Sequence, residues 1–172
     1  MRKLVLAVSA LLLLTACADA PDAGTPSALP TTPSQSAAPA SADYVVGTDL
    51  GMKPTIEFPA DAGNVDSLII TDVVEGSGAA VQPNDNVTVQ YVGVGALSKQ
   101  QFDASWDAGS TASFPLNGVI IGWQQGLVGM KVGGRRLLVI PGDLAYGPTP
   151  PDGSGIQPNE TLVFVVDLIS IP

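Results

Sequence analysis

The sequence contains no histidine and a single cysteine, Cys17. Without histidine the chain cannot build a Ser-His-Asp or Cys-His catalytic arrangement, and it lacks the commonest protein ligand of zinc. One cysteine cannot form a disulfide within the chain. We therefore expect a function that needs no metal or other cofactor, and a fold that depends on its apolar core.

Basic residues are also scarce. The chain has seven Lys and Arg against sixteen Asp and Glu, and two of the seven, Arg2 and Lys3, lie at the N-terminus. Removal of those two would leave five basic residues and a net charge near −11. We exclude a nucleic-acid partner, because phosphate binding depends on clustered Lys and Arg. Solubility explains the acidity more simply than an acidic recognition function does.

The apolar run nearest the N-terminus is too short to cross a bilayer. Residues 4–16 follow the basic pair and have 13 residues, whereas a spanning helix needs about 20. A basic start and a short apolar run are typical of an export signal. The run ends in Leu14-Thr15-Ala16-Cys17, which resembles the bacterial lipobox, in which the cysteine is acylated. The alternative is an ordinary signal peptide with a chance cysteine.

We therefore interpret residues 1–16 as a lipoprotein signal peptide and Cys17 as the lipidation site. The expected location is outside the cytoplasm, at the cell surface or in the periplasm, with the lipid holding the protein on a membrane. Residues 18–42 are rich in Ala, Pro, Ser and Thr and have no hydrophobic period. Such a composition buries too little apolar surface to offset the entropy of ordering. Residues 17–43 are thus predicted to be a disordered tether.

The rest of the chain divides into an extension and one domain. Residues 44–66 carry apolar side chains interrupted by Pro54 and Pro59. We interpret them as an irregular N-terminal extension that adds a short edge strand. Residues 67–172 are long enough for one hydrophobic core and too short for two.

Hydrophobic patterning predicts an α+β domain. Val87, Val89 and Tyr91 alternate with polar residues, which predicts a strand, and β-branched runs predict others at 68–74, 136–140 and 162–169. The last run is apolar on both faces, as in a central strand covered from two sides. Apolar residues at 120, 123, 127 and 130 recur at helical spacing, and glycines at 122, 126 and 129 shorten that helix. The expected architecture is a curved antiparallel sheet wrapped around one short α-helix.

Five of the nine aromatic residues lie in five short motifs, and a sixth, Phe114, lies between the second and the third motif. Together these motifs supply an apolar cavity and almost no reactive chemistry, which suits a function that works by binding and desolvation. Taken singly, each aromatic side chain is more often a core residue, and Asp103 alone is more often a turn residue. The motifs are Val87-Thr88-Val89-Gln90-Tyr91, Phe102-Asp103-Ala104-Ser105, Val119-Ile120-Ile121-Gly122-Trp123, Ala145-Tyr146-Gly147 and Thr161-Leu162-Val163-Phe164.

In this order and spacing, the five motifs resemble those of the FKBP-type peptidyl-prolyl isomerases, over residues 67–172. The resemblance implies that Trp123 forms the floor under the substrate proline ring. It implies that Tyr146 donates a hydrogen bond to a substrate carbonyl, and that Asp103 orients Tyr91 or a ligand hydroxyl. Ala112 stands where the family has a second aromatic, so that wall is expected to be more open. The remaining pocket residues implied by the resemblance are Phe102, Phe114, Val119, Ile120, Ile156 and Phe164.

The resemblance also implies an activity and partners. The activity is rotation of X-Pro bonds in exported, proline-containing or unfolded polypeptides, without a cofactor, by a monomer. Macrolides of the rapamycin and tacrolimus type are the implied inhibitors. Two other functions stay open: a binding module or chaperone that holds such segments with little turnover, and a structural lipoprotein without a substrate.

Overall fold

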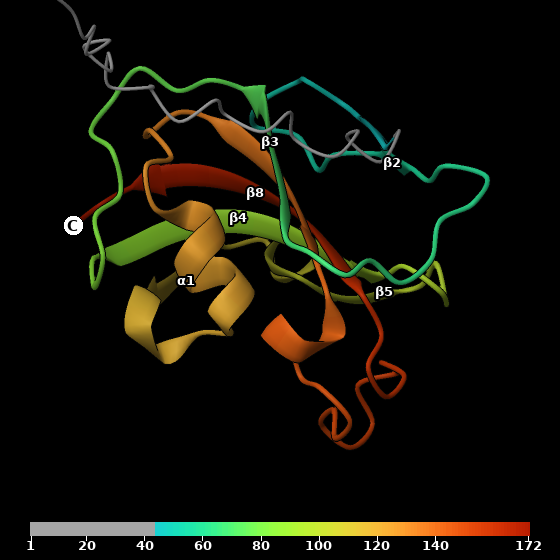
Figure 1. The fold of residues 1–172 in the computed structure, drawn as a ribbon. Helices are drawn as coiled ribbons and strands as arrows, with labels where there is room; N and C mark the ends of the chain where they lie inside the picture. Colours follow the sequence, from blue (N-terminus) through green and yellow to red (C-terminus); the bar gives the residue numbers. More distant parts are fainter. Residues whose placement is uncertain (1–43) are drawn as a thin grey trace, which may run out of the picture. The chain divides into compact units, whose positions relative to one another are not determined.

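The computed structural model describes residues 44–172, and the predictions for residues 1–43 lie outside this range. Six strands form an antiparallel sheet in the order β3-β7-β8-β4-β5, and β6 also pairs with β4. Figure 1 shows α1 lying across one face of this curved sheet. The α+β prediction is therefore confirmed. The strands are β3 (Ile69–Val74), β4 (Asn86–Gly95), β5 (Gln101–Ala104), β6 (Ala112–Pro115), β7 (Arg135–Ile140) and β8 (Leu162–Ser170).

The central strand β8 is covered on both faces, as its sequence predicts. Phe164 and Val166 face the core that contains α1, whereas Val163 and Val165 face a second cluster on the other side of the sheet. All four side chains are buried. Alternation with a period of two thus places a hydrophobic layer on each face of the same strand.

The helix α1 (Ile121–Leu127) is short and packs tightly against β7. A Cβ on Gly122 would overlap the side chain of Ile140, and one on Gly126 would lie 2.7 Å from a Leu138 methyl carbon. The glycines therefore do more than weaken the helix, because their missing side chains let its backbone approach the sheet. This close approach brings Trp123, the residue after Gly122, into the core.

Two short strands of the domain, β5 and β6, were not predicted. Each has four residues with alternating burial, too few for the pattern to stand out from a loop. Both pair with the ten-residue strand β4, β6 along its first half and β5 along its second. They place Phe102, Asp103 and Phe114 beside β4 and so complete one wall of the site.

The prediction of an edge strand in the N-terminal extension (residues 44–66) is wrong. The extension contains β1 (Val45–Val46) and β2 (Ile56–Glu57), which pair with each other and not with the six-stranded sheet. Val46 and the partly buried Phe58 pack on the sheet face opposite α1. Covering this face removes apolar side chains of β7 and β8 from water, which edge pairing would not do.

A buried arginine fastens the extension to the domain. Arg135 is fully buried and pairs with Asp167 of β8, its Nε donating to Oδ1 at 2.5 Å and its Nη2 to Oδ2 at 2.7 Å. Its remaining N–H groups donate to the carbonyl oxygens of Gly47 at 2.6 Å and Met52 at 2.9 Å. One guanidinium therefore joins the sheet to two points of the extension.

Candidate active site

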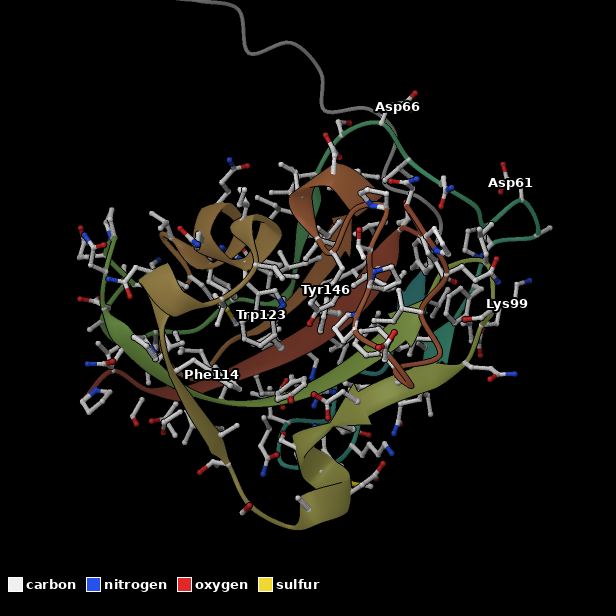
Figure 2. The ribbon with its side chains drawn as sticks, turned by 90° about the horizontal axis from the view of Figure 1, so that it is seen from below. Asp61, Asp66, Lys99, Phe114, Trp123 and Tyr146 are labelled. Carbon is white, nitrogen blue, oxygen red and sulfur yellow. The ribbon has the colours of Figure 1, made fainter. Side chains whose placement is uncertain are left out.

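A cavity of about 290 Å³ opens on the α1 side of the sheet. Strands β4, β5, β6 and β8, the start of α1 and the turn after η3 (Gly142–Leu144) each contribute to its lining. Figure 2 shows Trp123, Phe114 and Tyr146 gathered in this region. The residues that line the cavity are Tyr91, Phe102, Asp103, Phe114, Gly118, Val119, Ile120, Trp123, Tyr146 and Phe164.

Trp123 occupies the centre of the aromatic lining. Its ring meets those of Tyr91, Phe114 and Phe164 edge to face, at centroid distances of 5.5, 5.8 and 5.3 Å. Edge-to-face pairs place the positive edge of one ring against the negative face of another, which fixes their relative orientation. Trp123 is 4% exposed and has neighbours on several sides. The indole is thus a rigid apolar surface at the bottom of the cavity.

A glycine in β4 makes room for two of the pocket rings. Gly93 pairs with Phe164 of β8 on one side and with Asp103 of β5 on the other. A Cβ at this position would lie 2.6 Å from the Phe102 ring and 2.8 Å from the Phe164 ring. Because glycine has no Cβ, these two rings meet at a centroid distance of 5.5 Å.

The polar edge of the cavity is formed by Tyr91 and Asp103. The Tyr91 hydroxyl donates to Asp103 Oδ2 at 2.5 Å. Burial raises the pKa of Tyr91 well above its ordinary range, and the Asp103 carboxylate, which accepts the hydrogen bond of the hydroxyl, raises it further. Ser105, which follows β5, accepts a hydrogen bond from the Tyr91 backbone N–H at 2.8 Å. The tyrosine is therefore held neutral and in one orientation.

Tyr146 lies at the mouth of the cavity, where its side chain is 37% exposed. It follows η3, whose residue Gly142 lies so close to Asn159 that a Cβ there would be 2.5 Å from the Asn159 carbonyl oxygen. Partial burial raises the pKa of Tyr146, and the charge of Asp103 raises it further. Its hydroxyl is therefore a neutral hydrogen-bond donor at neutral pH.

The buried carboxylate of Glu160 is a positioning group that the sequence analysis missed. It is 2% exposed and accepts backbone N–H groups from two loops. Oε1 accepts from Leu97 at 3.1 Å and Ser98 at 2.9 Å, and Oε2 accepts from Gln157 at 2.8 Å. These bonds join the loop that follows Tyr146 to the turn between β4 and β5. No sequence motif marks this role, because its three partners are backbone groups.

The structure brings together nine of the ten pocket residues that the sequence predicts, and it adds Gly118. The exception is Ile156, which is partly buried and packs against the core but does not line the cavity. Ala112 is also partly buried and outside the lining. Nearby, the Gln124 side-chain amide donates to the Val119 carbonyl at 2.8 Å and fixes the turn before α1. The predicted lipidation site, Cys17, lies outside the described residues.

Within residues 44–172, no three His, Cys, Asp or Glu side chains come together as a possible metal site. None of the helices described there is long and apolar enough to cross a membrane. The residues that line the cavity offer apolar contact from their rings, together with hydrogen bonding by Tyr91, Asp103 and Tyr146.

All three tyrosines, Tyr44, Tyr91 and Tyr146, should ionise above pH 10. Burial is the main cause of the raised pKa in each case, and the ordinary tyrosine pKa is about 10. Unfolded tyrosines lose their protons first as the pH rises, so the folded state should lose stability above pH 10. Absorbance at 295 nm should show later tyrosinate formation in the native protein than in guanidinium. A native midpoint at or below pH 10 would contradict the buried hydroxyls.

Comparison with known proteins agrees with this geometry. Residues 78–169 match the family of FKBP-type peptidyl-prolyl cis-trans isomerases. The chain is 52% identical over 119 residues to a probable FK506-binding protein of Corynebacterium glutamicum, covering 69% of this chain and 98% of that protein. It is 44% identical over 104 residues to the FKBP-type isomerase FkpA of Escherichia coli, covering 60% of this chain and 37% of FkpA.

The crystal structure of Escherichia coli FkpA is similar in fold. It superposes with a TM-score of 0.56 at 40% sequence identity, over 64% of this chain and 52% of that one. Three observations lead to one assignment: the ring-lined cavity, the helix α1 against the antiparallel sheet, and the matched sequence. The chain belongs to the family of FKBP-type peptidyl-prolyl cis-trans isomerases.

Proposed function

We propose that this isomerase rotates X-Pro bonds by transferring the prolyl ring from water onto the Trp123 indole. The observation that carries the proposal is the cavity itself, in which the rings of Tyr91, Phe114 and Phe164 surround Trp123 and the Phe102 ring packs against Phe164. The planar X-Pro imide is more polar than its twisted transition state, because twisting ends conjugation between nitrogen and carbonyl. An apolar site therefore withdraws more solvation from the ground state than from the transition state.

The magnitudes are consistent with this mechanism. Rotation about a peptide bond has a barrier of about 18–20 kcal/mol, and uncatalysed X-Pro exchange takes tens to hundreds of seconds. Lowering the barrier by roughly 5–8 kcal/mol would accelerate exchange by about four to six decades. No proton needs to be transferred, so the neutral Tyr91 and Tyr146 hydroxyls serve only as hydrogen-bond donors. Tyr146, at the mouth, is the proposed donor to the substrate carbonyl.

Exchange spectroscopy by NMR on a short Leu-Pro peptide tests the proposal. The wild type should broaden the cis and trans signals at substoichiometric concentration, and Tyr146→Phe should lower kcat/KM by roughly tenfold with unchanged thermal stability. Ser113→Ala, on the exposed face of β6 and outside the cavity lining, is the matched control and should leave exchange unchanged. A well-folded wild type that only binds the peptide would indicate the holding function. A Tyr146→Phe protein with full activity would remove the hydroxyl from the mechanism.

Macrolides of the tacrolimus type are proposed to occupy the same cavity. The similarity to a probable FK506-binding protein supports this ligand class, as does the apolar lining around Trp123. Such a ligand should inhibit peptide exchange competitively and quench the Trp123 fluorescence on binding.

We further propose that the enzyme acts on exported polypeptides while anchored to a membrane as a monomer. The support is the basic start, the short apolar run and the Leu14-Thr15-Ala16-Cys17 sequence, followed by a tether rich in Pro, Ser and Thr. A lipid chain contributes about 0.8 kcal/mol for each buried CH₂, so an acylated cysteine with more than one chain would hold the protein on the bilayer.

Cys17→Ser should move the protein from the membrane to the soluble fraction outside the cytoplasm. Serine has no thiol, so it cannot form the thioether that attaches the lipid. Fractionation followed by immunoblotting measures the change, and Ser34→Ala in the tether is the control. A Cys17→Ser variant that still sediments with membranes would exclude this anchor.

A further inference from the structure

The segments that build the cavity carry negative charge and no positive charge. Residues 100–130 and 137–172 supply every lining residue except Tyr91, and they contain no lysine or arginine. They contain six carboxylates. These are Asp103, Asp107, Asp143, Asp152, Glu160 and Asp167.

The five lysine and arginine side chains of residues 44–172 do not line the cavity. Four of these five side chains are in ion pairs with carboxylates: Lys53 with Asp107, Lys131 with Glu75, Arg135 with Asp167 and Arg136 with Asp72. The fifth, Lys99, lines a separate groove together with Lys53, Ile56 and Phe58. Ile56 and Phe58 pack on the sheet face opposite the cavity. In Figure 2, Lys99 lies at the edge of the molecule, away from Trp123 and Phe114.

Three of the six carboxylates are exposed and lie in the cavity lining or within six residues of the lining residue Tyr146 in sequence. Asp103 lines the cavity, is exposed, and accepts the hydrogen bond of the Tyr91 hydroxyl. Asp143 in η3 is exposed and precedes Tyr146 by three residues, and the exposed Asp152 follows in the next loop. The negative charge of Asp103 raises the pKa of the Tyr146 hydroxyl and so helps to keep that hydroxyl protonated.

We propose that this isomerase selects prolines preceded by lysine or arginine and discriminates against prolines preceded by aspartate or glutamate. The proline itself enters the apolar cavity, whereas its neighbours must leave through the mouth, past Asp103 and the loop that carries Asp143 and Asp152. A substrate cation there meets carboxylates that no lysine or arginine neutralises, and a substrate carboxylate meets charges of its own sign. The proposal rests on the isomerase activity of the cavity.

Coulomb's law gives the size of the expected discrimination. A unit charge about 7 Å from one carboxylate in a water-like medium changes binding roughly threefold. Replacing a lysine by a glutamate changes the substrate by two charges, so the two rates should differ by about five- to tenfold at low salt. Salt at 0.5 M should reduce the ratio to about twofold or less, because exposed charges are screened within a few ångströms.

The experiment compares three peptides, Ala-Lys-Pro-Phe, Ala-Gln-Pro-Phe and Ala-Glu-Pro-Phe, by NMR exchange at low and high salt. Exchange is measured directly, so no coupling protease adds its own preference. We expect kcat/KM to fall from Lys to Gln to Glu, with a lysine-to-glutamate ratio that shrinks as salt is added. Equal rates, a reversed order or a ratio that salt does not change would overturn the proposal. A Leu-Pro peptide reports the isomerase activity separately, so failure of catalysis and failure of selection are distinguishable.

Charge-neutralising variants locate the effect. Asp143→Asn/Asp152→Asn removes two exposed charges that lie on either side of Tyr146 in sequence and outside the cavity lining. It should halve the lysine-to-glutamate ratio or reduce it further, while Leu-Pro exchange is unchanged. Asp49→Asn/Asp61→Asn removes two exposed charges from the N-terminal extension and should leave the ratio as it is. If both double variants change the lysine-to-glutamate ratio equally, the selection arises from the net charge of the protein. The assignment of the selection to Asp143 and Asp152 then fails.

Discussion

Arg135→Met should lower the free energy of unfolding by about 3–5 kcal/mol, which is the typical effect of removing one partner of a buried ion pair. The substitution leaves the Asp167 carboxylate, 3% exposed, without its cation. It also leaves the carbonyl oxygens of Gly47 and Met52 without their guanidinium donors. Urea denaturation followed by tryptophan fluorescence measures the loss, because urea unfolds the protein without screening the ion pair.

Two controls make this result specific. Lys131→Met breaks the exposed pair with Glu75, and it should leave the urea midpoint nearly unchanged because exposed pairs contribute little. Arg135→Met/Asp167→Leu removes both charges and should recover much of the stability, since apolar side chains can replace a buried pair. If Arg135→Met alone is as stable as the wild type, the pair does not hold the extension and sheet together.

Trp123→Ala should lower kcat/KM for a Leu-Pro peptide by roughly tenfold or more, because the substrate loses the surface on which its ring rests. It should also reduce the free energy of unfolding by about 3–5 kcal/mol, since the indole is buried and meets three rings. Activity is therefore measured at a temperature where circular dichroism shows the variant to be folded. Trp123→Phe keeps an aromatic surface, so it should retain more activity and more stability than Trp123→Ala.

The second tryptophan of the chain provides the matched control. Trp106 lies in η1 (Ser105–Ala108) and packs beside Val92 and Val94, away from the cavity lining. Trp106→Ala should destabilise the protein through lost packing yet leave kcat/KM of the folded molecules unchanged. Equal losses of activity in Trp106→Ala and Trp123→Ala would mean that stability, and not the pocket floor, controls turnover.

Local patterns predicted four of the six strands of the sheet, and the family resemblance predicted the cavity. The alternation of Val163, Phe164, Val165 and Val166 identified a strand with two buried faces, and both faces are buried. The motif residues were found because each motif is a short, continuous stretch whose aromatic side chain is easily recognised. The resemblance then placed these stretches, far apart in sequence, around one pocket.

Features that depend on distant partners were not predictable in this way. Ile156 matched a family position, yet its loop places it against the core and outside the cavity lining. The extension was expected at a sheet edge, but its hydrophobic residues cover the sheet face opposite α1. Glu160 was not singled out, because its hydrogen bonds to Leu97 and Ser98 cross more than 60 positions in sequence.

The strand faces and the helical stripe around Trp123 follow from side-chain polarity and backbone periodicity, both of which are local. The exclusion of histidine chemistry follows from composition, and the composition of the pocket wall follows from the family resemblance of the motifs. Tertiary structure alone decided that Arg135 lies opposite Asp167 across β7 and β8, and that Lys53 pairs with Asp107, 54 positions away in sequence. Register and loop placement decide which charges become neighbours, and neither is encoded in any one segment of the chain.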